Sequence, residues 1–262
     1  MGLDRVKNAF HRNRTAFMPY TVLGYPTQSM SLQVVKMLVD VGADLLELGV
    51  PFSDPLADGP TIQNATQKAL ENGITLDRCI RMVSDLRSDG VDIPALLMSY
   101  VNPILAYGVR KFVVDCASAG VDGFIVPDLP PEEAGGMEDA CMDLGLALVY
   151  LIAPTTPPER LSLIVEKSRG FIYLVSLTGV TGTRDMLPAG LTSFVKRVRA
   201  MTDKPLAVGF GISKGEHATR VGQIADGVIV GSALVEQASK SVKHVYALAK
   251  ELREALDSAA QI

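Results

Sequence analysis

Residues 44–60 read DLLELGVPFSDPLADGP, and this stretch predicts both a fold and a site. Its first seven residues have the length of a strand and are mostly apolar, which is typical of a strand buried on both faces of a parallel sheet. Glu47 stands at the centre of this run, and Asp54 and Asp58 follow in a loop rich in proline and glycine. A buried carboxylate is costly unless it is paired, hydrogen-bonded or used in chemistry, so Glu47 needs an explanation from the rest of the chain.

Seven further apolar runs of similar length recur along the chain, and helical patterns separate most of them. The runs are AFMPYTVLG (16–24), PALLMSY (94–100), GFIVPD (123–128), ALVYLIA (147–153), FIYLVSL (171–177), PLAVGFG (205–211) and GVIVGS (227–232). Eight strand–helix units in about 250 residues predict a closed (β/α)8 TIM barrel. The alternative is an open doubly wound sheet, although no G-x-G-x-x-G follows the first run. We expect one domain over residues 1–262, with an extra N-terminal helix before Ala16 that covers the barrel bottom.

The composition is that of an ordinary globular protein. The 262 residues are 48% hydrophobic and 21% charged, with a net charge of −4, which argues against nucleic acid as the main partner. No apolar run reaches the length of a membrane span, and the N-terminus has no signal-peptide core. Cys79, Cys116 and Cys141 are widely spaced and odd in number, which favours buried free thiols in a reducing compartment. The sequence therefore predicts a cytoplasmic protein with neither a nucleic-acid nor a membrane partner.

The alternation of side chains along the second strand decides where Glu47 points. It turns Glu47 and Gly49 toward the barrel interior and Leu46 and Leu48 toward the helix layer. One interpretation of Glu47 is a structural ion pair, but no strand run contains a lysine or arginine to pair with it. A desolvated, unpaired glutamate has a raised pKa, which suits a general acid near neutral pH.

The loop after this strand brings Asp54 and Asp58 to the C-terminal rim, where TIM barrels carry their active sites. Either aspartate is also explained by turn chemistry, which favours this residue type. If the loop folds back over the barrel mouth, Asp58 faces Glu47 across one pocket.

Glycine-rich turns end three consecutive strands. They are TGVTGT (178–183), GFGIS (209–213) and VGS (230–232), with Ser232 as the expected N-cap of the last helix. Loops seven and eight of this architecture often bind phosphate through backbone N–H groups, although each turn alone is explained as an ordinary tight turn. Three such turns in succession favour a phosphate site.

The residues that other chemistries need are missing from the strand ends. His11, His217 and His244 fall on predicted helices or their connections, and no carboxylate–histidine set suggests a metal. No strand carries a lysine for a Schiff base, and no Ser-His-Asp arrangement is evident. The residues thus predict a metal-free acid–base enzyme that acts on a phosphorylated small molecule.

Over nearly its whole length the chain resembles the tryptophan synthase α subunit family. ELGVPFSDPLADGP resembles the family's identifying segment nearly position for position, and AFMPYTVLGYP, MSYVNPILAYG, GFIVPDLPPEE and YLVSLTGVTG also match. The resemblance implies a retro-aldol cleavage of indole-3-glycerol phosphate to indole and glyceraldehyde 3-phosphate. It implies that Glu47 is the catalytic acid and base, and that Asp58 accepts a hydrogen bond from the indole N–H.

The same resemblance implies the rest of the site. The residues expected around the indole are Tyr20, Met98, Tyr100, Ile125, Tyr173 and Phe210, and those expected at the phosphate are Gly182, Gly211, Gly231 and Ser232. Thr181 would close over Asp58 on a lid formed by the loop after the sixth strand. Plain core packing is the alternative for the tyrosines and Phe210.

The resemblance also implies a partner, the β subunit, in an α2β2 complex. Pyridoxal phosphate belongs to that partner, and neither cofactor nor metal is expected in this chain. Asp54 and Pro55 are expected at the contact. Leu177 and Thr178 stand where some family members carry Arg-Ala, a departure that concerns lid closure and signalling between subunits.

Three other functions stay open on the sequence alone. The first is a stand-alone lyase that releases free indole, which activity of the isolated chain would distinguish. The second is another phosphate-binding barrel enzyme, such as a sugar-phosphate isomerase or epimerase. The third is a non-catalytic barrel kept as an allosteric partner, against which the presence of both Glu47 and Asp58 counts.

Overall fold

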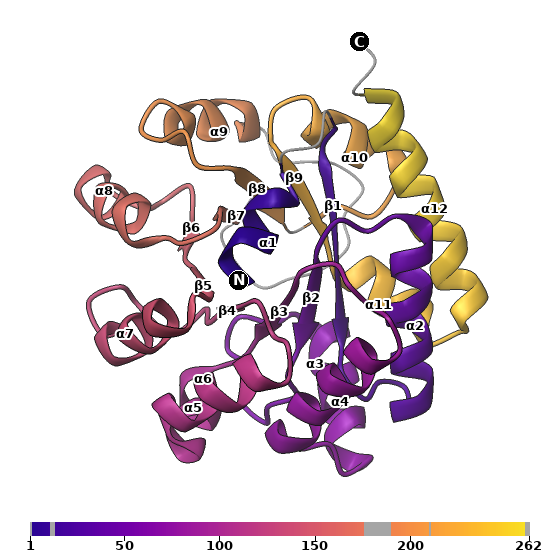
Figure 1. Ribbon diagram of the computed structural model, residues 1–262. Helices are drawn as coiled ribbons and strands as arrows, with labels where there is room; N and C mark the ends of the chain where they lie inside the picture. The colour runs from indigo at the N-terminus through magenta and orange to yellow at the C-terminus, as the bar shows by residue number, and fades with distance from the viewer. Residues whose placement is uncertain (1, 11–13, 176–189, 210, 260–262) are drawn as a thin grey trace.

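The computed structural model describes residues 2–10, 14–175, 190–209 and 211–259 and forms a parallel β-barrel ringed by helices (Figure 1). The sheet order is β5-β4-β3-β2-β1-β9-β8-β7-β6. The strands are β1 (Ala16–Val22), β2 (Leu46–Gly49), β3 (Ala95–Met98), β4 (Gly123–Ile125), β5 (Ala147–Val149), β6 (Leu151–Ile152), β7 (Ile172–Val175), β8 (Leu206–Gly209) and β9 (Gly227–Val230). Strands β5 and β6 are two halves of one apolar run, interrupted at Tyr150. The ends of the sheet therefore meet, which confirms the predicted (β/α)8 barrel over an open sheet.

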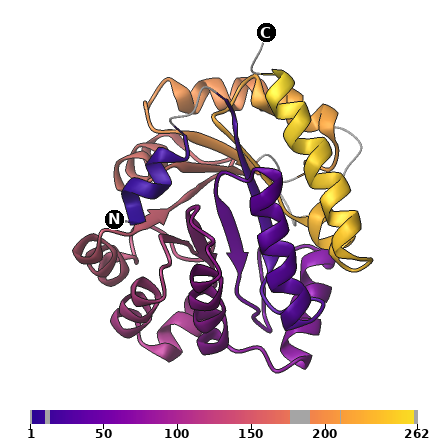
Figure 2. The same ribbon diagram turned by 45° about the vertical axis from the view of Figure 1, so that its right-hand side comes forward.

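The helices follow the strands, as the alternating patterns predict. They are α1 (Gly2–Asn8), α2 (Gln28–Val41), α3 (Pro60–Glu71), α4 (Leu76–Ser88), α5 (Val101–Tyr107), α6 (Val109–Ser118), α7 (Gly135–Leu144), α8 (Pro158–Lys167), α9 (Leu191–Arg199), α10 (Gly215–Gly222), α11 (Ser232–Ala238) and α12 (Val242–Ala259). Local sequence sets their ends. Helix α2 starts after Thr27, whose hydroxyl accepts the Met30 N–H at 3.2 Å, and stops at Gly42 with φ 99°. Figure 2 shows α2 packed beside the C-terminal helix α12.

Helix α1 lies across the end of the barrel at which the strands begin (Figure 1). The Leu3 N–H donates to the Gly145 carbonyl at 2.8 Å, and Val6 is fully buried. The Phe10 and Phe171 rings lie 5.4 Å apart beneath the strands. The extra N-terminal helix at the barrel bottom is thereby confirmed.

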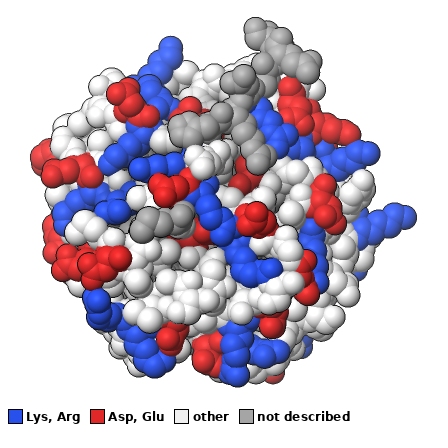
Figure 3. Space-filling model, in the orientation of Figure 1, with Lys and Arg blue, Asp and Glu red and all other residues white. Residues whose placement is uncertain are grey.

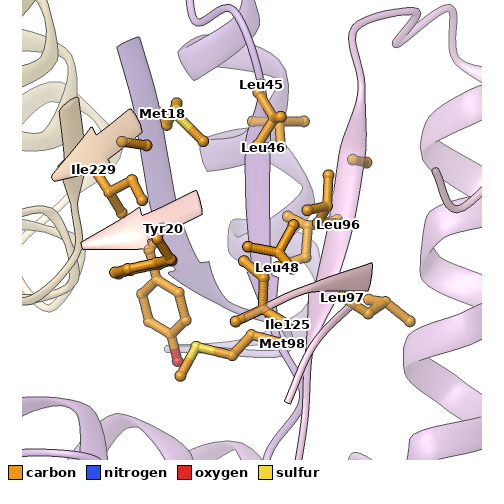
Figure 4. Close-up of a cluster of buried hydrophobic side chains, with 14 of the residues drawn as sticks. Met18, Tyr20, Leu45, Leu46, Leu48, Leu96, Leu97, Met98, Ile125 and Ile229 are labelled. Atoms are coloured by element: carbon orange, nitrogen blue, oxygen red, sulfur yellow. The ribbon is translucent and has the colours of Figure 1, made fainter. Parts of the chain in front are cut away.

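The interior faces of neighbouring strands fit together through the placement of glycines. Tyr20 on β1 pairs in register with Glu47 on β2, so both side chains point to the same side of the sheet. A Cβ at Gly49 would lie 2.3 Å from the Tyr20 hydroxyl oxygen, so only glycine leaves room for this ring. Glu47 and Gly49 therefore face the interior, as the alternation predicts. Figure 4 shows Tyr20, Met98 and Ile125 at the same end of the strands.

A repeated aspartate motif fixes the opposite end of the barrel. The Asp44 N–H donates to the Phe17 carbonyl at 2.9 Å, and the Asp44 carboxylate accepts the Phe17 N–H at 2.9 Å. The same carboxylate pairs with Arg253 at 3.0 Å and with Arg14 at 2.9 Å. We call this arrangement an aspartate clasp, because one residue joins two strands through both its backbone and its side chain.

Asp122 and Asp226, directly before β4 and β9, form two further clasps. The partners are, for Asp122, the Ala95 N–H at 2.8 Å and Arg87 at 2.6 Å, and, for Asp226, the Leu206 N–H at 2.7 Å and Arg199. In each case the aspartate N–H also donates to the carbonyl of the same strand residue, at 2.9 Å. The three clasps thus give a cationic partner to the buried carboxylates of Asp44 and Asp122 and to the half-exposed carboxylate of Asp226.

Candidate active site

Glu47 lies inside the C-terminal half of the barrel, 1% exposed. Its Oε2 atom is buried and has no hydrogen-bond partner among the described residues. Burial and the nearby charge of Asp58 raise the pKa of Glu47 to about 8. At neutral pH the Glu47 carboxyl group therefore carries a proton that it can donate.

Asp58 comes from the loop that folds back after β2, directly before α3. It is 4% exposed, and its Oδ2 atom accepts the Tyr100 hydroxyl at 3.0 Å. Its Oδ1 atom is buried without a hydrogen-bond partner among the described residues. Burial raises the pKa of Asp58 to about 6, against the lowering effect of the Tyr100 hydrogen bond. Asp58 is therefore mostly ionised at neutral pH, whereas Glu47 is mostly protonated.

Backbone and side-chain hydrogen bonds hold the loop of Asp58 in place. The Asp58 N–H donates to the Pro55 carbonyl at 3.1 Å, and the Ala57 N–H donates to the Tyr100 hydroxyl at 3.2 Å. The Gln63 side-chain amide donates to the Asp58 carbonyl at 2.7 Å. The fold-back that the sequence left open is thus fixed by contacts with Tyr100, the N-cap of α5, and with Gln63 on α3.

Two buried tyrosines face the carboxylates. Burial raises the pKa of Tyr20 and Tyr173, and the negative charges of both carboxylates raise it further. A Cβ at Gly209 would lie 2.5 Å from the Tyr173 hydroxyl oxygen, as one at Gly49 would meet Tyr20. Each ring thus occupies space that a neighbouring glycine leaves open. The structure brings Tyr20, Tyr100 and Tyr173 together with Glu47 and Asp58, as expected.

The remaining predicted pocket residues fall into two groups. Met98 and Ile125 pair in register on β3 and β4 and are 8% and 0% exposed. Thr181, Gly182 and Phe210 lie outside the described residues. So do Leu177 and Thr178, at which the sequence departs from some family members.

Two of the predicted phosphate-binding turns follow neighbouring strands. Gly211, with φ 79°, follows β8, and Gly231 follows β9. The prediction for Ser232 was wrong in one respect. Gly231 is the N-cap of α11 and makes no side-chain hydrogen bond, Ser232 is the first helical residue, and α12 comes after this helix. With Gly231 at the N-cap, at φ −112° and ψ −87°, the helix starts one residue earlier than predicted.

Asp54 lies on the outer side of the same loop and takes no part in the carboxylate pair. Its carboxylate is exposed and accepts the Ser53 hydroxyl at 2.5 Å. Leu56, two residues on, is 80% exposed. This side of the loop faces away from Glu47 and presents an apolar side chain to its surroundings.

Sequence reasoning missed two contacts at the site. The Phe52 and Tyr100 rings lie 5.6 Å apart, so Phe52 covers Tyr100 from the loop side. Tyr100 was expected to line the pocket, but its direct hydrogen bond to Asp58 was not foreseen. The sequence signals for these contacts were Phe52 in the loop and Tyr100, two residues after the end of β3.

Two of the histidines lie on helices of the outer layer. His217 is buried on α10, where its Nδ1 atom lies 3.5 Å from the Ser213 hydroxyl, and His244 is exposed on α12. Within the described ranges, no three His, Cys, Asp or Glu side chains are grouped as metal ligands would be. Cys79, Cys116 and Cys141 are free and buried, as predicted. None of the helices that the structure describes is long and apolar enough to cross a membrane.

Comparison with known proteins identifies the family. Residues 6–261 match the family model described as tryptophan synthase alpha chain. The chain belongs to the tryptophan synthase alpha chain family. The alpha chain of Roseiflexus castenholzii is 51% identical over 91% of this chain and 93% of its own. That of Dehalococcoides mccartyi is 48% identical over 97% of this chain and its own entire length. A structure of Mycobacterium tuberculosis tryptophan synthase superposes with a TM-score of 0.89 at 40% identity, covering 97% of this chain and 96% of that one.

Family membership confirms the main functional prediction. Tryptophan synthase alpha chains are carbon–carbon lyases of tryptophan biosynthesis, and they pair with a β subunit. The alternative of an isomerase or epimerase on another phosphate-binding barrel is thereby set aside.

Proposed function

We propose that this alpha chain cleaves indole-3-glycerol phosphate by acid–base catalysis in which Glu47 and Asp58 divide the work. The observation that carries the proposal is the pair of buried carboxyl groups with unpartnered oxygens and different pKa values, about 8 and about 6. One group holds a proton at neutral pH while the other is charged. Pairs of carboxyl groups with pKa values pushed apart in this way mark the acid and the base of an active site.

The reaction needs one proton delivered and one removed. Protonated Glu47 gives its proton to the indole ring carbon that bears the side chain, and positive charge develops on the ring nitrogen. Asp58 accepts the indole N–H and stabilises that charge in a site shielded from water. The Glu47 carboxylate then takes the proton of the adjacent hydroxyl. The carbon–carbon bond breaks, and its electron pair returns to the ring to give indole and glyceraldehyde 3-phosphate.

The surrounding residues bind and orient the substrate in this proposal. Tyr20, Met98, Ile125 and Tyr173 supply an apolar enclosure for the indole, together with Tyr100 and Phe210. The turns at Gly211 and Gly231, with Ser232 and Gly182, hold the phosphate through backbone N–H groups at adjacent strand ends. Thr181 closes over Asp58 when substrate is bound.

We further propose that the outer side of the β2 loop docks the β subunit in an α2β2 complex. Exposed Asp54, with Pro55 beside it, supplies polar contacts, and Leu56 offers an apolar side chain of the kind that interfaces bury. Pyridoxal phosphate belongs to the β subunit, whereas this chain works without cofactor or metal. A cytoplasmic location and a single domain remain predictions from the sequence.

Indole release from indole-3-glycerol phosphate tests the proposal, measured with and without a β subunit. We expect Glu47→Gln and Asp58→Asn each to lower kcat by about 10²–10⁴-fold, the usual share of an acid–base group. Asp143→Asn, an exposed carboxylate on α7, is the matched control and should keep full activity. Circular dichroism confirms that each variant is folded.

Three outcomes would overturn parts of the proposal. If folded Glu47→Gln keeps wild-type kcat, the acid–base assignment is wrong. If the β subunit leaves the rate unchanged and wild type is fully active alone, the chain is a stand-alone lyase. A wild-type chain that is inactive in both settings would point to the non-catalytic alternative.

A further inference from the structure

A cavity lies at the barrel bottom, at the opposite end from Glu47. It measures about 440 Å³ and opens between α1, the end of α8 and the starts of β7 and β8. Its lining residues are Leu3, Lys7, Glu166, Ser168, Arg169, Gly170, Lys204 and Pro205. No residue of the proposed active site takes part in it.

Two polar groups in the lining lack a partner. Ser168 is 2% exposed, and its hydroxyl is buried without a hydrogen-bond partner among the described residues. The Arg169 Nε–H is buried and unpartnered in the same sense. No ion pair or side-chain hydrogen bond joins the Arg169 guanidinium to another described residue. Because buried donors are almost always satisfied, these two buried atoms, in neighbouring residues of the cavity wall, mark a place where an acceptor is missing.

The lining is positively charged. Lys7, Arg169 and Lys204 contribute three cations against the single carboxylate of Glu166. The Lys204 ammonium donates to the Val165, Glu166 and Ser168 carbonyls at 2.6, 3.1 and 2.7 Å, so it holds the loop while its charge stays without a carboxylate. Burial lowers the pKa of Lys204, the charge of Glu166 raises it, and the charges of Lys7 and Arg169 lower it. Figure 3 shows acidic and basic side chains interspersed over the face that carries α1 in Figure 1.

Comparison with the aspartate clasps shows what the cavity lacks. Arg169 precedes Gly170-Phe171-Ile172 as Asp122 precedes Gly123-Phe124-Ile125, and its N–H likewise donates to the neighbouring strand, at the Leu148 carbonyl and 2.9 Å. At the three clasps this position carries a carboxylate that meets an arginine. Here the arginine itself occupies the position, and no carboxylate is supplied.

We propose that this cavity binds a small oxyanion, either inorganic phosphate or the phosphate group of a monoester. The guanidinium of Arg169 and the hydroxyl of Ser168 donate hydrogen bonds to it. Lys204 and Lys7 supply further positive charge from the floor and the mouth. Guanidinium and hydroxyl donors together suit phosphate oxygens, and the site is separate from the substrate phosphate site at the other end of the barrel.

Residue-resolved NMR titration tests the proposal on the full chain. Inorganic phosphate is added at constant ionic strength, and the amide signals of Gly170 and Gly231 report the bottom and the top of the barrel separately. We expect a saturable shift at Gly170, weakened tenfold or more by Arg169→Gln and several-fold by Ser168→Ala. Arg110→Gln removes an exposed arginine paired with Asp143 and should leave the affinity at Gly170 unchanged. A parallel titration with glycerol 2-phosphate identifies the source, since the tighter of the two ligands is the better model of the natural one.

Several results would overturn the site. The first is the absence of a saturable shift at Gly170. The second is a phosphate affinity in Arg169→Gln and Ser168→Ala that equals the wild-type affinity. The third is a loss of affinity in the Arg110→Gln control as large as the loss in Arg169→Gln. Indole release should be unchanged in Arg169→Gln, because the bottom cavity does not touch the substrate. A failure of the catalytic assignment would alter the Glu47→Gln result and leave this titration as it is.

Discussion

The two ends of the barrel treat buried carboxylates in opposite ways. At the bottom, Asp44 is 1% exposed and meets Arg253, Arg14 and a strand N–H. At the top, Glu47 is equally buried, but its Oε2 atom has no partner among the described residues, and another carboxylate lies near it. The same chemical group therefore forms ion pairs with two arginines at one end, whereas at the other end burial favours its protonated form.

This difference shows how one fold separates stability from chemistry. A clasp offsets the desolvation of its carboxylate with a guanidinium and a backbone N–H, and it joins two strands and a helix. The top of the barrel leaves that desolvation largely uncompensated, which costs stability and places a proton where a reaction needs one. Removing a carboxylate should accordingly have opposite effects on stability at the two ends.

The largest effect on stability is expected at the bottom. Asp44→Asn removes the buried charge partner of Arg253, which is 5% exposed, and leaves this guanidinium only the half-exposed Asp257 at 2.8 Å. Loss of one member of a buried pair typically costs about 3–5 kcal/mol, so the free energy of unfolding should fall by up to that amount. Urea unfolding at pH 7 measures it, with Asp143→Asn expected within about 0.5 kcal/mol of wild type. A loss below about 1 kcal/mol would mean that the clasp contributes little beyond its backbone hydrogen bonds.

Glu47→Gln should have the opposite sign. The pKa of Glu47 is raised from 4.5 to about 8, so folding binds a proton between these pH values. This stability contribution is fully present below pH 4.5 and is lost as the pH rises through 8, at about 1.4 kcal/mol per pH unit. Glutamine cannot ionise, so the variant should be more stable than wild type by about 3 kcal/mol at pH 7.

Unfolding of Glu47→Gln and wild type in parallel at pH 5 and pH 8 measures this difference directly. Other titrating groups largely cancel in the comparison, so the advantage of the variant should grow with pH. A difference that stays constant with pH would show that Glu47 is ionised in the native protein, and would remove the contrast between the two ends.

Sequence patterns predicted the strand that carries Glu47 better than the contacts around it. The period-two alternation in DLLELGV turned Glu47 and Gly49 inward, because a strand offers only two faces. The same reasoning could not say that Asp58 folds back, since that depends on Tyr100, a residue 42 positions away in the chain. The start of α11 was missed by one residue, because the backbone conformation of Gly231, and not the capping capacity of Ser232, decides it.

The clasps were not foreseen, although their aspartates are visible in the sequence. Asp122 and Asp226 precede Gly-Phe-Ile and Gly-Val-Ile, and Arg169 precedes Gly-Phe-Ile in the same way. A residue before a strand is read most simply as a turn residue. Only the tertiary structure shows that an arginine from a distant helix meets each aspartate, and that Arg169 breaks the pattern.

The third prediction sharpens the contrast through the pH dependence of catalysis. Asp58 must be ionised to stabilise positive charge, and Glu47 must be protonated to act as the acid. With pKa values of about 6 and about 8, kcat/KM should form a bell with its maximum near pH 7. Outside this window the rate should fall about tenfold per pH unit on each side. In Asp58→Asn the acidic limb should disappear from the kcat/KM profile of the remaining activity. If the acidic limb persists in this variant, it belongs to the titration of another group.

The smallest expected effect comes from the hydrogen bond that keeps Asp58 ionised. Tyr100→Phe removes the hydroxyl that donates to Asp58 at 3.0 Å and thereby removes an influence that lowers the pKa of this carboxylate. A hydrogen bond of this kind is worth about 1 kcal/mol, so the acidic limb of kcat/KM should move up by about half to one pH unit. The basic limb, which Glu47 sets, should stay in place. Tyr107→Phe is the matched control, because that hydroxyl donates to Asp115 at 2.7 Å on the helix layer, away from the site. A shift of both limbs together in Tyr100→Phe would mean that Tyr100 acts through the packing of the loop and not through the charge of Asp58. A shift of the acidic limb in Tyr107→Phe as well would mean the same.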